Sequence, residues 1–184
     1  MSAPTAKTPW KNDDCGKILC IEGFCRKNGN TQALLNKFLS DYVGFAIKRY
    51  NTFEKNPKPC IGCDFCSKDG ACRFRDLDDF FYFFETADIV VFASPVYNLS
   101  FPAPLKALLD RLQPYYNGFF SDERKQRIKK RRNAYFLATA GQDGALGFDI
   151  MERQLKNIFS VTNIKYMGGS LVGNTDNTTP KCEL

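Results

Sequence analysis

Four of the eight cysteines in this 184-residue chain lie in one short segment, at Cys60, Cys63, Cys66 and Cys72. Thiolate sulfur binds iron and zinc, so closely spaced cysteines on one loop can hold a metal centre. Three cysteines at successive Cys-x2-Cys spacing suit a 4Fe–4S cluster, whereas structural zinc sites more often join two such pairs across a longer spacer. The spacing therefore favours a cluster, with zinc or a reduced, metal-free loop as the alternatives.

A disulfide framework is a weaker explanation of these cysteines. The N-terminal residues are polar, without the apolar core of a secretory signal, and no apolar run approaches the length of a membrane span. The expected compartment is therefore the cytoplasm, where thiols stay reduced. A chain of this length also buries enough surface to fold without covalent cross-links. We expect a mobile tail over residues 1–15 and a single domain over residues 16–184, which includes the cysteine loop 57–76.

Apolar segments alternate with helical patterns along the chain. Continuous apolar runs are typical of parallel strands that are covered on both faces. The alternation predicts an α/β fold with a doubly wound, five-stranded parallel sheet, whose ligands bind at the carboxyl ends of the strands. Pro102 and Pro104 mark one helix start. The expected strands span residues 17–24, 45–53, 88–95, 133–141 and 164–173, and further helices are expected over 31–42, 77–87 and 147–161.

The turn after the first expected strand has the sequence GFCRKNGNT, residues 23–31. Asn30 or Thr31 can cap the helix that follows, and the free N–H groups there favour an anion. Arg26 adds positive charge, and Gly29 lets the backbone approach a ligand closely. The turn has neither the Gly-Lys-Ser/Thr ending of a Walker loop nor the three spaced glycines of a dinucleotide site. It suits the phosphate of a mononucleotide such as FMN, although an ordinary capped turn explains it equally well when it is considered alone.

Two further segments end strands at the same edge of the expected sheet. SPVYN, residues 94–98, offers Tyr97 to stack on a flat ring and Asn98 to bind the polar edge of that ring. TAGQDG, residues 139–144, supplies small residues such as Gly141 that leave room for a ring system. Because the carboxyl ends of parallel strands meet at one edge, the three loops should converge on one crevice. We expect a phosphate at the first loop and a flat ring between the other two.

The ordered combination of these motifs resembles the flavodoxin-like NAD(P)H-dependent FMN reductase family. GFCRKNGNT is similar to the family signature Gly-Ser-Pro-Arg-Lys-Asn-Gly-Asn-Thr, and SPVYNLSFPAPLKALLDR is similar to its second signature, Ser-Pro-Val-Tyr followed by Lys-x-x-x-Asp-Arg. The cysteine segment resembles that of the iron–sulfur flavoprotein branch. The resemblance covers residues 17–173 and implies a flavodoxin-like strand order of 2-1-3-4-5, with the cysteine-rich loop inserted after strand 2.

The same resemblance implies that FMN binds non-covalently at the three loops. By matching position, the phosphate would be held by Arg26, Asn28, Asn30 and Thr31, and the isoalloxazine would be flanked by Pro95, Val96, Tyr97 and Asn98. This chain has Phe24 and Cys25 where the family usually has Ser-Pro, so the usual hydroxyl donor is missing. We expect Cys25 to be a small buried thiol, and we interpret Cys15, Cys20 and Cys182 as incidental.

Together, FMN and a 4Fe–4S cluster convert between two-electron and one-electron transfer. The chain is therefore expected to be a flavin-dependent oxidoreductase that takes electrons from a ferredoxin-like donor or NAD(P)H. Its acceptor would be a small molecule such as a quinone, an oxygen species or a nitro-compound. The resemblance also implies a homodimer or homotetramer, in which a cluster serves the flavin of a neighbouring subunit. The alternatives are a plain NAD(P)H reductase with structural or vestigial cysteines, and a non-enzymatic redox or metal sensor.

Much of the formal net charge of +6 comes from the segment RKQRIKKRR, residues 124–132, where seven of nine residues are Lys or Arg. A solvated surface segment explains such a run, and so does a docking patch for an acidic redox partner. We favour the solvated segment. No nucleic-acid motif or interleaved aromatic platform accompanies the run, so neither nucleic acid nor membrane is expected as a partner.

Overall fold

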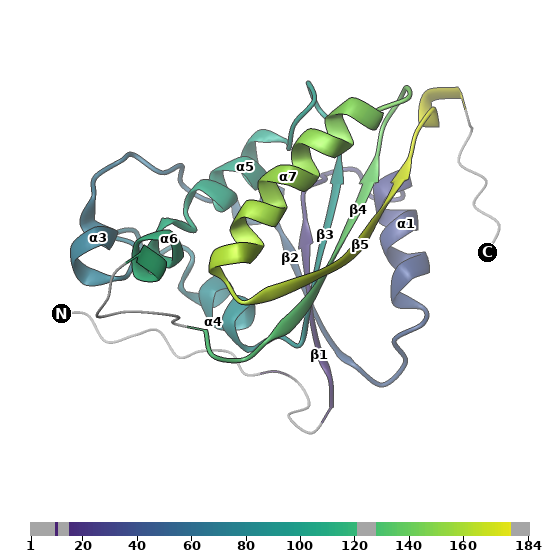
Figure 1. Ribbon diagram of the computed structural model, residues 1–184. Coiled ribbons are helices and arrows are strands. Elements are labelled where there is room, and N and C mark those ends of the chain that lie inside the picture. The colour runs from purple at the N-terminus through teal and green to yellow at the C-terminus, as the bar shows by residue number, and fades with distance from the viewer. Residues whose placement is uncertain (1–9, 11–14, 121–127, 178–184) are drawn as a thin grey trace.

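The computed structural model describes residue 10, residues 15–120 and residues 128–177. At its centre is a parallel sheet of five strands in the order β2-β1-β3-β4-β5, which confirms the predicted flavodoxin-like topology (Figure 1). The order reverses direction between β1 and β3, which is the switch point where ligands of such sheets bind. The strands are β1 (Lys17–Glu22), β2 (Ala46–Asn51), β3 (Ile89–Pro95), β4 (Arg132–Thr139) and β5 (Ile164–Val172).

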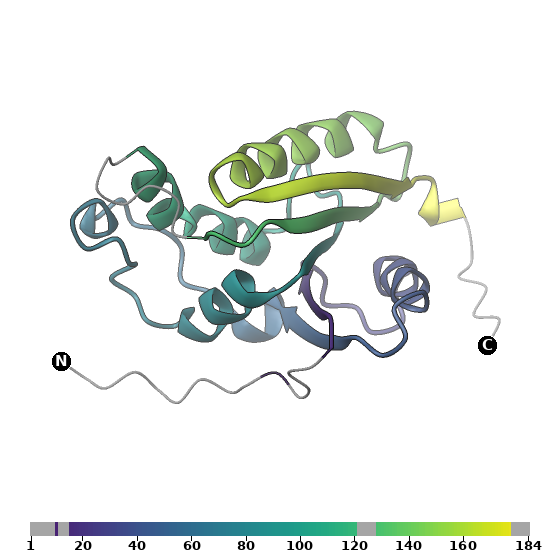
Figure 2. The same cartoon turned by 60° about the horizontal axis from the view of Figure 1, so that its bottom comes forward.

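Helices cover both faces of the sheet. Figures 1 and 2 show α1 on one face and α4, α5 and α7 on the other. The sequence pattern missed α2, α3 and α6. The helices α2 and α3, of four and five residues, display too few turns for an apolar stripe to be recognised. None of the described helices is long and apolar enough to cross a bilayer. The helices are α1 (Asn30–Leu39), α2 (Thr52–Lys55), α3 (Phe65–Asp69), α4 (Asp78–Thr86), α5 (Ala103–Asp110), α6 (Gln113–Phe120) and α7 (Ala145–Val161), and a 3-10 turn, η1, spans Thr175–Asn177.

Alternate residues of the central strands belong to two different hydrophobic cores. In β1, Ile18 and Cys20 pack on the α1 side of the sheet, whereas Leu19 and Ile21 pack on the opposite side. Burial raises the pKa of the Cys20 thiol to about 12. Cys20 is therefore a small buried residue of the strand, which agrees with its interpretation as incidental to the cysteine site.

The strand β2 ends at Asn51, two residues earlier than the sequence pattern predicts. The side-chain oxygen of Asn51 accepts hydrogen bonds from the N–H groups of Phe53 and Glu54, at 3.0 and 3.3 Å. Asn51 thus caps α2, and a capping residue takes the chain out of the strand. The predicted continuation of the strand through residue 53 is wrong for this reason.

Trp10 lies inside the predicted mobile tail, yet it is packed against the domain. Its side chain is 5% exposed, and its ring meets that of Phe83 edge-on at a centroid distance of 5.1 Å. The indole N–H donates a hydrogen bond to Thr86 Oγ1 at 2.9 Å. An isolated aromatic residue in a polar segment gives no periodic signal, so this contact with α4 could not be predicted.

The Trp10→Ala variant is expected to lower the free energy of unfolding by about 2 kcal/mol, because it removes a buried aromatic side chain that packs against α4. Denaturant titration of the full chain measures the change. Trp10→Phe keeps most of the ring contact and loses the hydrogen bond to Thr86. It should therefore lower the free energy of unfolding by less than half as much as Trp10→Ala does. Equal stability of Trp10→Ala and the parent would contradict the packing described here.

The predicted basic run is not a uniform solvated surface. Residues 124–127 lie outside the described part of the chain, and residues 129–131 are exposed. Arg132, however, begins β4 and is 1% exposed. Its guanidinium donates to the carbonyl oxygens of Phe84 and Thr162 and lies over the Phe84 ring. The solvated interpretation is therefore wrong for Arg132, which joins β4 to the ends of α4 and α7.

Glu152 connects α7 to β5 and makes the stability of this edge depend on pH. It accepts a hydrogen bond from Tyr166 Oη at 2.7 Å and pairs with Lys156 at 2.5 Å. Desolvation opposes ionisation, but the bonds from Lys156 and Tyr166 outweigh it and hold the carboxyl pKa below its ordinary 4.5. A depressed folded pKa stabilises the protein above the unfolded pKa, and this contribution is lost as the pH falls.

Glu152→Gln should therefore lower the free energy of unfolding by about 1 kcal/mol at neutral pH. The difference from the parent should shrink as the pH falls through the folded pKa of Glu152, since the parent then loses the same charge. Denaturant titrations at neutral pH and near pH 3 would measure both values. A difference that stays constant over this range would contradict the linkage.

Candidate functional site

A pocket of about 460 Å³ lies where β1, β3 and β4 end. The turn after β1, the turn after β3 and the end of β4 converge on it, as the sequence predicts for a ligand crevice. The η1 segment adds a fourth wall. Each residue predicted to contact the cofactor lines this pocket, with the exception of Asn98. The lining comprises residues 24–32, residues 95–97, Thr139, Gly141, Thr175 and Asp176.

The helix α1 begins at this pocket without a side-chain cap. Gly29 occupies the N-cap position, no side-chain oxygen bonds to the first turn, and that turn contains no acidic residue. The prediction that Asn30 or Thr31 caps the helix is therefore wrong. The first N–H groups of a helix have no partner within it, so an uncapped start is open to an anion. Arg26 and Lys27 line the same pocket and add positive charge.

Thr31 is 5% exposed and faces the sheet instead of capping its helix. Its hydroxyl shares a hydrogen bond of 2.6 Å with the hydroxyl of Thr139 at the end of β4. This buried bond ties the start of α1 to the floor of the pocket. Thr139 is not among the predicted site residues, although a hydroxyl at the end of an otherwise apolar strand is a signal that could have identified it.

The turn after β3 reverses the chain tightly at residues 97–100. Tyr97 and Ser100 exchange two backbone hydrogen bonds, of 2.9 and 2.8 Å. Asn98 and Leu99 both have positive φ, 48° and 61°, which is the backbone of a type I′ turn. The turn leaves Tyr97 on the pocket wall, 47% exposed, and places Asn98 beyond it. Asn98 is not among the residues that line the pocket, so its contact with the polar edge of a ring stays a prediction.

Gly141 marks a close approach between the end of β4 and η1. A Cβ atom on Gly141 would lie 2.3 Å from Asp176 Oδ2, so only glycine fits without a shift. The N–H of Asp176 donates to the carbonyl oxygen of Gly141 at 3.1 Å, and the Thr175 hydroxyl donates to that of Ala140 at 2.9 Å. The family resemblance ends at residue 173, so none of the predicted site residues belongs to this wall. Polar residues following a fifth parallel strand at the same sheet edge could have indicated it.

Cys25 lies on the pocket rim and is exposed, so the expectation of a buried thiol is wrong. The neighbouring Phe24 takes the buried position instead and is 8% exposed. The side chains of successive residues in extended backbone point to opposite sides. The larger apolar side chain packs on the α1 side of the sheet, which leaves the thiol facing solvent.

The four clustered cysteines line a second pocket, of about 430 Å³, beside α5 and α6. Cys60 and Cys63 are exposed, whereas Cys66 and Cys72 are partly buried. Gly62 and Gly70 have positive φ, 64° and 70°, in the loop that carries them. Within the described ranges, no three Cys, Asp or Glu side chains are close enough to form a ready ligand set for a metal ion. The four thiols thus share one pocket without being gathered around one point.

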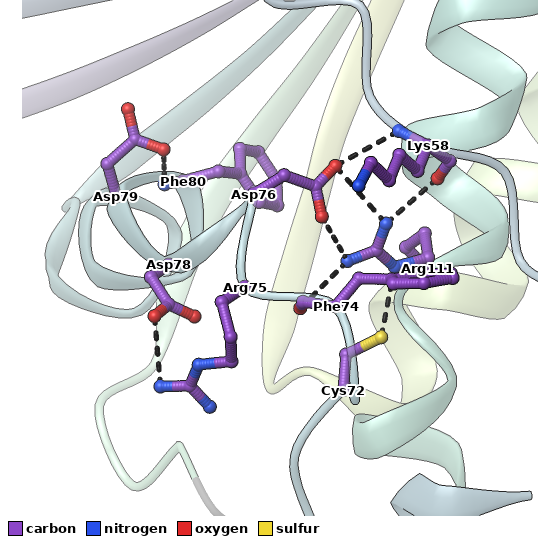
Figure 3. Close-up of polar contacts among 9 residues, drawn as sticks. All are labelled: Lys58, Cys72, Phe74, Arg75, Asp76, Asp78, Asp79, Phe80 and Arg111. Atoms are coloured by element: carbon purple, nitrogen blue, oxygen red, sulfur yellow. Dashed lines mark hydrogen bonds and ion pairs between the residues drawn. The ribbon is translucent and has the colours of Figure 1, made fainter. Parts of the chain in front are cut away.

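Two of these sulfurs accept hydrogen bonds from side chains of the α5–α6 segment. Arg111 Nε donates to Cys72 Sγ at 3.0 Å, as Figure 3 shows. Asn117 Nδ2 donates to Cys66 Sγ at 3.2 Å. N–H donors of this kind stabilise negative charge on sulfur, and four sulfur donors suit iron–sulfur or zinc sites better than sites for hard cations. The donor set therefore fits a 4Fe–4S cluster, and four thiolates also suit a structural zinc ion.

The two pockets lie apart in the molecule. They share no lining residue. In both views, α3 and α6 lie at the opposite end of the domain from α1, whose N-terminus opens the first pocket (Figures 1 and 2). A ligand at the strand ends and a metal group at the cysteines would therefore be separated within one chain.

Comparisons with known proteins agree with these features. Residues 16–177 match the model of the family NADPH-dependent FMN reductase. An iron–sulfur flavoprotein from Methanocaldococcus jannaschii is 28% identical over 155 residues, which cover 83% of this chain and 76% of that protein. An iron–sulfur flavoprotein from Archaeoglobus fulgidus is 35% identical over 102 residues, 54% of this chain and 46% of the relative.

Among solved structures, an NAD(P)H:quinone oxidoreductase from Methanothermobacter marburgensis superposes with a TM-score of 0.69 at 16% identity, covering 91% of this chain and 89% of the other. This likeness supports the fold. The family match is the stronger finding, because it spans the sheet, the strand-end pocket and the cysteine loop. The chain therefore belongs to the NADPH-dependent FMN reductase family and is a flavin-dependent oxidoreductase.

Proposed function

We propose that this chain transfers electrons from a ferredoxin-like donor or NAD(P)H to a small acceptor, with FMN and a 4Fe–4S cluster as its cofactors. The acceptor would be a quinone, an oxygen species or a nitro-compound, and the compartment would be the cytoplasm. One observation carries the proposal. The same domain contains a pocket at its strand ends, where the uncapped start of α1 can bind an anion, and a second pocket lined by all four clustered cysteines. The names of the relatives from M. jannaschii and A. fulgidus support the same combination.

In this proposal the FMN phosphate lies at the uncapped start of α1. The side chains that would bind it are Arg26, Asn28, Asn30 and Thr31, together with the first N–H groups of the helix. Gly141 lines the same pocket. The ring would be flanked by Pro95, Val96, Tyr97 and Asn98. FMN, when bound, supplies transfer of electrons in pairs or singly. The residues of the chain bind, orient and shield it, so the absence of histidine is no obstacle.

The cluster would be held by Cys60, Cys63, Cys66 and Cys72. Their shared pocket and the two N–H donors on Cys66 and Cys72 support this assignment. Such a cluster carries one electron at a time. Because the two pockets lie at different ends of the domain, we also propose a homodimer or homotetramer in which the cluster of one subunit approaches the flavin of another.

A plain NAD(P)H reductase is the second candidate. The description of the family as NADPH-dependent FMN reductases favours it, and so does the name of the structural neighbour from M. marburgensis, an NAD(P)H:quinone oxidoreductase. The exposed face of Tyr97 beside the pocket leaves room for a nicotinamide to approach a flavin. In this case the cysteines would be structural. A redox or metal sensor would leave the strand-end pocket without a use, so we rank it below both.

Anaerobic stopped-flow reduction distinguishes these functions. The purified protein is mixed with reduced ferredoxin, with NADPH or with NADH, and the visible absorbance is followed. Electron transfer through a cluster predicts rapid bleaching with ferredoxin. Rapid reduction by NADPH or NADH alone, with no response to ferredoxin, would favour the plain reductase. Slow reduction by every donor would favour the sensor.

A further inference from the structure

Arg111, at the end of α5, is a charged side chain with only 1% exposure. Burying a guanidinium is costly unless its donors are bonded. Nε donates to Cys72 Sγ at 3.0 Å, Nη1 to the carbonyl oxygen of Lys58 at 2.8 Å and to Asp76 Oδ2 at 3.4 Å. Nη2 donates to the carbonyl oxygen of Phe74 at 3.1 Å and to Asp76 Oδ1 at 2.9 Å. The five N–H groups of a guanidinium thus meet five acceptors.

These acceptors lie on both sides of the cysteine loop. Lys58 precedes Cys60 in the sequence, whereas Phe74 and Asp76 follow Cys72. Figure 3 shows Lys58, Phe74 and Asp76 around the guanidinium of Arg111. Asp76 Oδ2 also accepts the N–H of Lys58 at 3.0 Å, which joins the two ends of the loop directly. The loop has little packing of its own, since α3 contains no buried residue. The bonds of Arg111 and Asp76 join the two ends of this loop, and the ammonium group of Lys58 also lies over the Phe74 ring, 5.5 Å from its centroid.

The bond from Arg111 Nε to Cys72 Sγ has a different consequence, because its acceptor is a cysteine sulfur. Arg111 and Asn117 each direct an N–H at one of the cysteines, the first at Cys72 and the second at Cys66. Asp76 balances the charge of Arg111, but it does not redirect the Nε–H group away from the sulfur. Hydrogen bonds to the sulfurs of an iron–sulfur cluster raise its reduction potential, since they stabilise the more negative reduced form.

We propose that Arg111 is a positioning residue with two roles: it closes the cysteine loop through Lys58, Phe74 and Asp76, and together with Asn117 it sets the reduction potential of the bound cluster. The first role rests on the described contacts alone. The second rests on the proposed function, because it requires a 4Fe–4S cluster at the cysteines. Neither role makes Arg111 a ligand.

Three variants of the full chain, purified without oxygen, separate the two roles. Arg111→Met keeps an apolar stem and removes every N–H donor. Asn117→Leu removes only the bond to Cys66. Arg75→Met is the matched control, because Arg75 lies beside the same loop, is 63% exposed and pairs only with Asp78 among the ion pairs of the described residues. The measurements are amide hydrogen exchange over residues 58–76, iron content and the midpoint potential of the cluster, with the flavin potential as an internal reference.

Arg111→Met should speed amide exchange in the loop by about tenfold or more and should also lower the cluster potential. Asn117→Leu should lower the potential and leave exchange unchanged. Arg75→Met should change neither. Should Arg111→Met fail to fold, Arg111→Lys replaces it in the same measurements, since it keeps the charge but loses the planar fork.

Exchange in the Arg111 variant that equals exchange in Arg75→Met would overturn the loop-closing role. A cluster potential that is unchanged in both Arg111→Met and Asn117→Leu would overturn the potential-setting role. A parent protein without iron would reject the proposed cluster and the potential-setting role with it. The exchange measurement would still decide whether Arg111 closes the loop, so the two failures remain distinguishable.

Discussion

Replacing Gly29 with aspartate should abolish tight FMN binding while leaving the fold intact. Gly29 is the N-cap of α1, with φ −83° and ψ 166°, a backbone conformation that any residue adopts. A Cβ atom there would meet Arg26 at 3.3 Å, a tight contact that a small shift relieves. The new carboxylate would cap the open N–H groups and place negative charge where the phosphate is proposed to lie. We expect FMN affinity to fall by about a hundredfold or more.

Gly29→Asn is the matched control for that variant. Its side-chain oxygen caps the helix in the same way but carries no charge. Gly29→Asn should retain much more FMN affinity than Gly29→Asp. The free energies of unfolding of both variants should lie within about 0.5 kcal/mol of that of the parent. Quenching of flavin fluorescence measures the affinity, and thermal unfolding measures the stability. Equal FMN affinity in the aspartate and asparagine variants would show that the phosphate binds elsewhere.

Substituting Cys63 with serine should remove most of the iron from the chain and leave FMN in place. Cys63 is exposed and lines the cysteine pocket, so the change should cost little stability. A hydroxyl is a poor ligand for iron in a cluster, so retained iron should fall about tenfold. The flavin pocket contains none of the four cysteines, so its occupancy should not change.

Cys25→Ser provides the comparison, because Cys25 is an exposed thiol that lines the strand-end pocket and does not line the cysteine pocket. It should keep the full iron content of the parent. Iron and FMN are determined per chain after anaerobic purification of both variants. Iron that survives in Cys63→Ser, or that is lost in Cys25→Ser, would be incompatible with a cluster on the cysteine loop.

The sequence pattern predicted those parts of the molecule that repeat along the chain. Apolar runs such as Ile89–Pro95 are buried on both faces, so their composition alone indicates a covered parallel strand. The carboxyl ends of parallel strands share one edge, which is why three of the loops that line the pocket could be named before the structure was known. The family signatures contain the same loops.

Features that depend on distant contacts could not be predicted. Thr31 looks like a helix cap in sequence, but its hydroxyl meets Thr139, which is more than a hundred residues away along the chain. Asn98 follows Tyr97 directly, yet the turn formed with Ser100 removes it from the pocket. Arg111 belongs to an apolar helix pattern, and only the folded chain brings it to both ends of the cysteine loop. Each of these outcomes depends on a partner that local patterns do not identify.

The most direct test of the account is the composition of the protein purified without oxygen. Iron, sulfide, zinc and FMN are measured per chain, together with the visible spectrum. A 4Fe–4S cluster on the four cysteines and FMN in the strand-end pocket predict about four iron atoms and one FMN per chain, with flavin peaks above a broad iron–sulfur absorbance. FMN without iron would contradict the cluster and leave a plain reductase, and a chain with neither cofactor would contradict the proposed function.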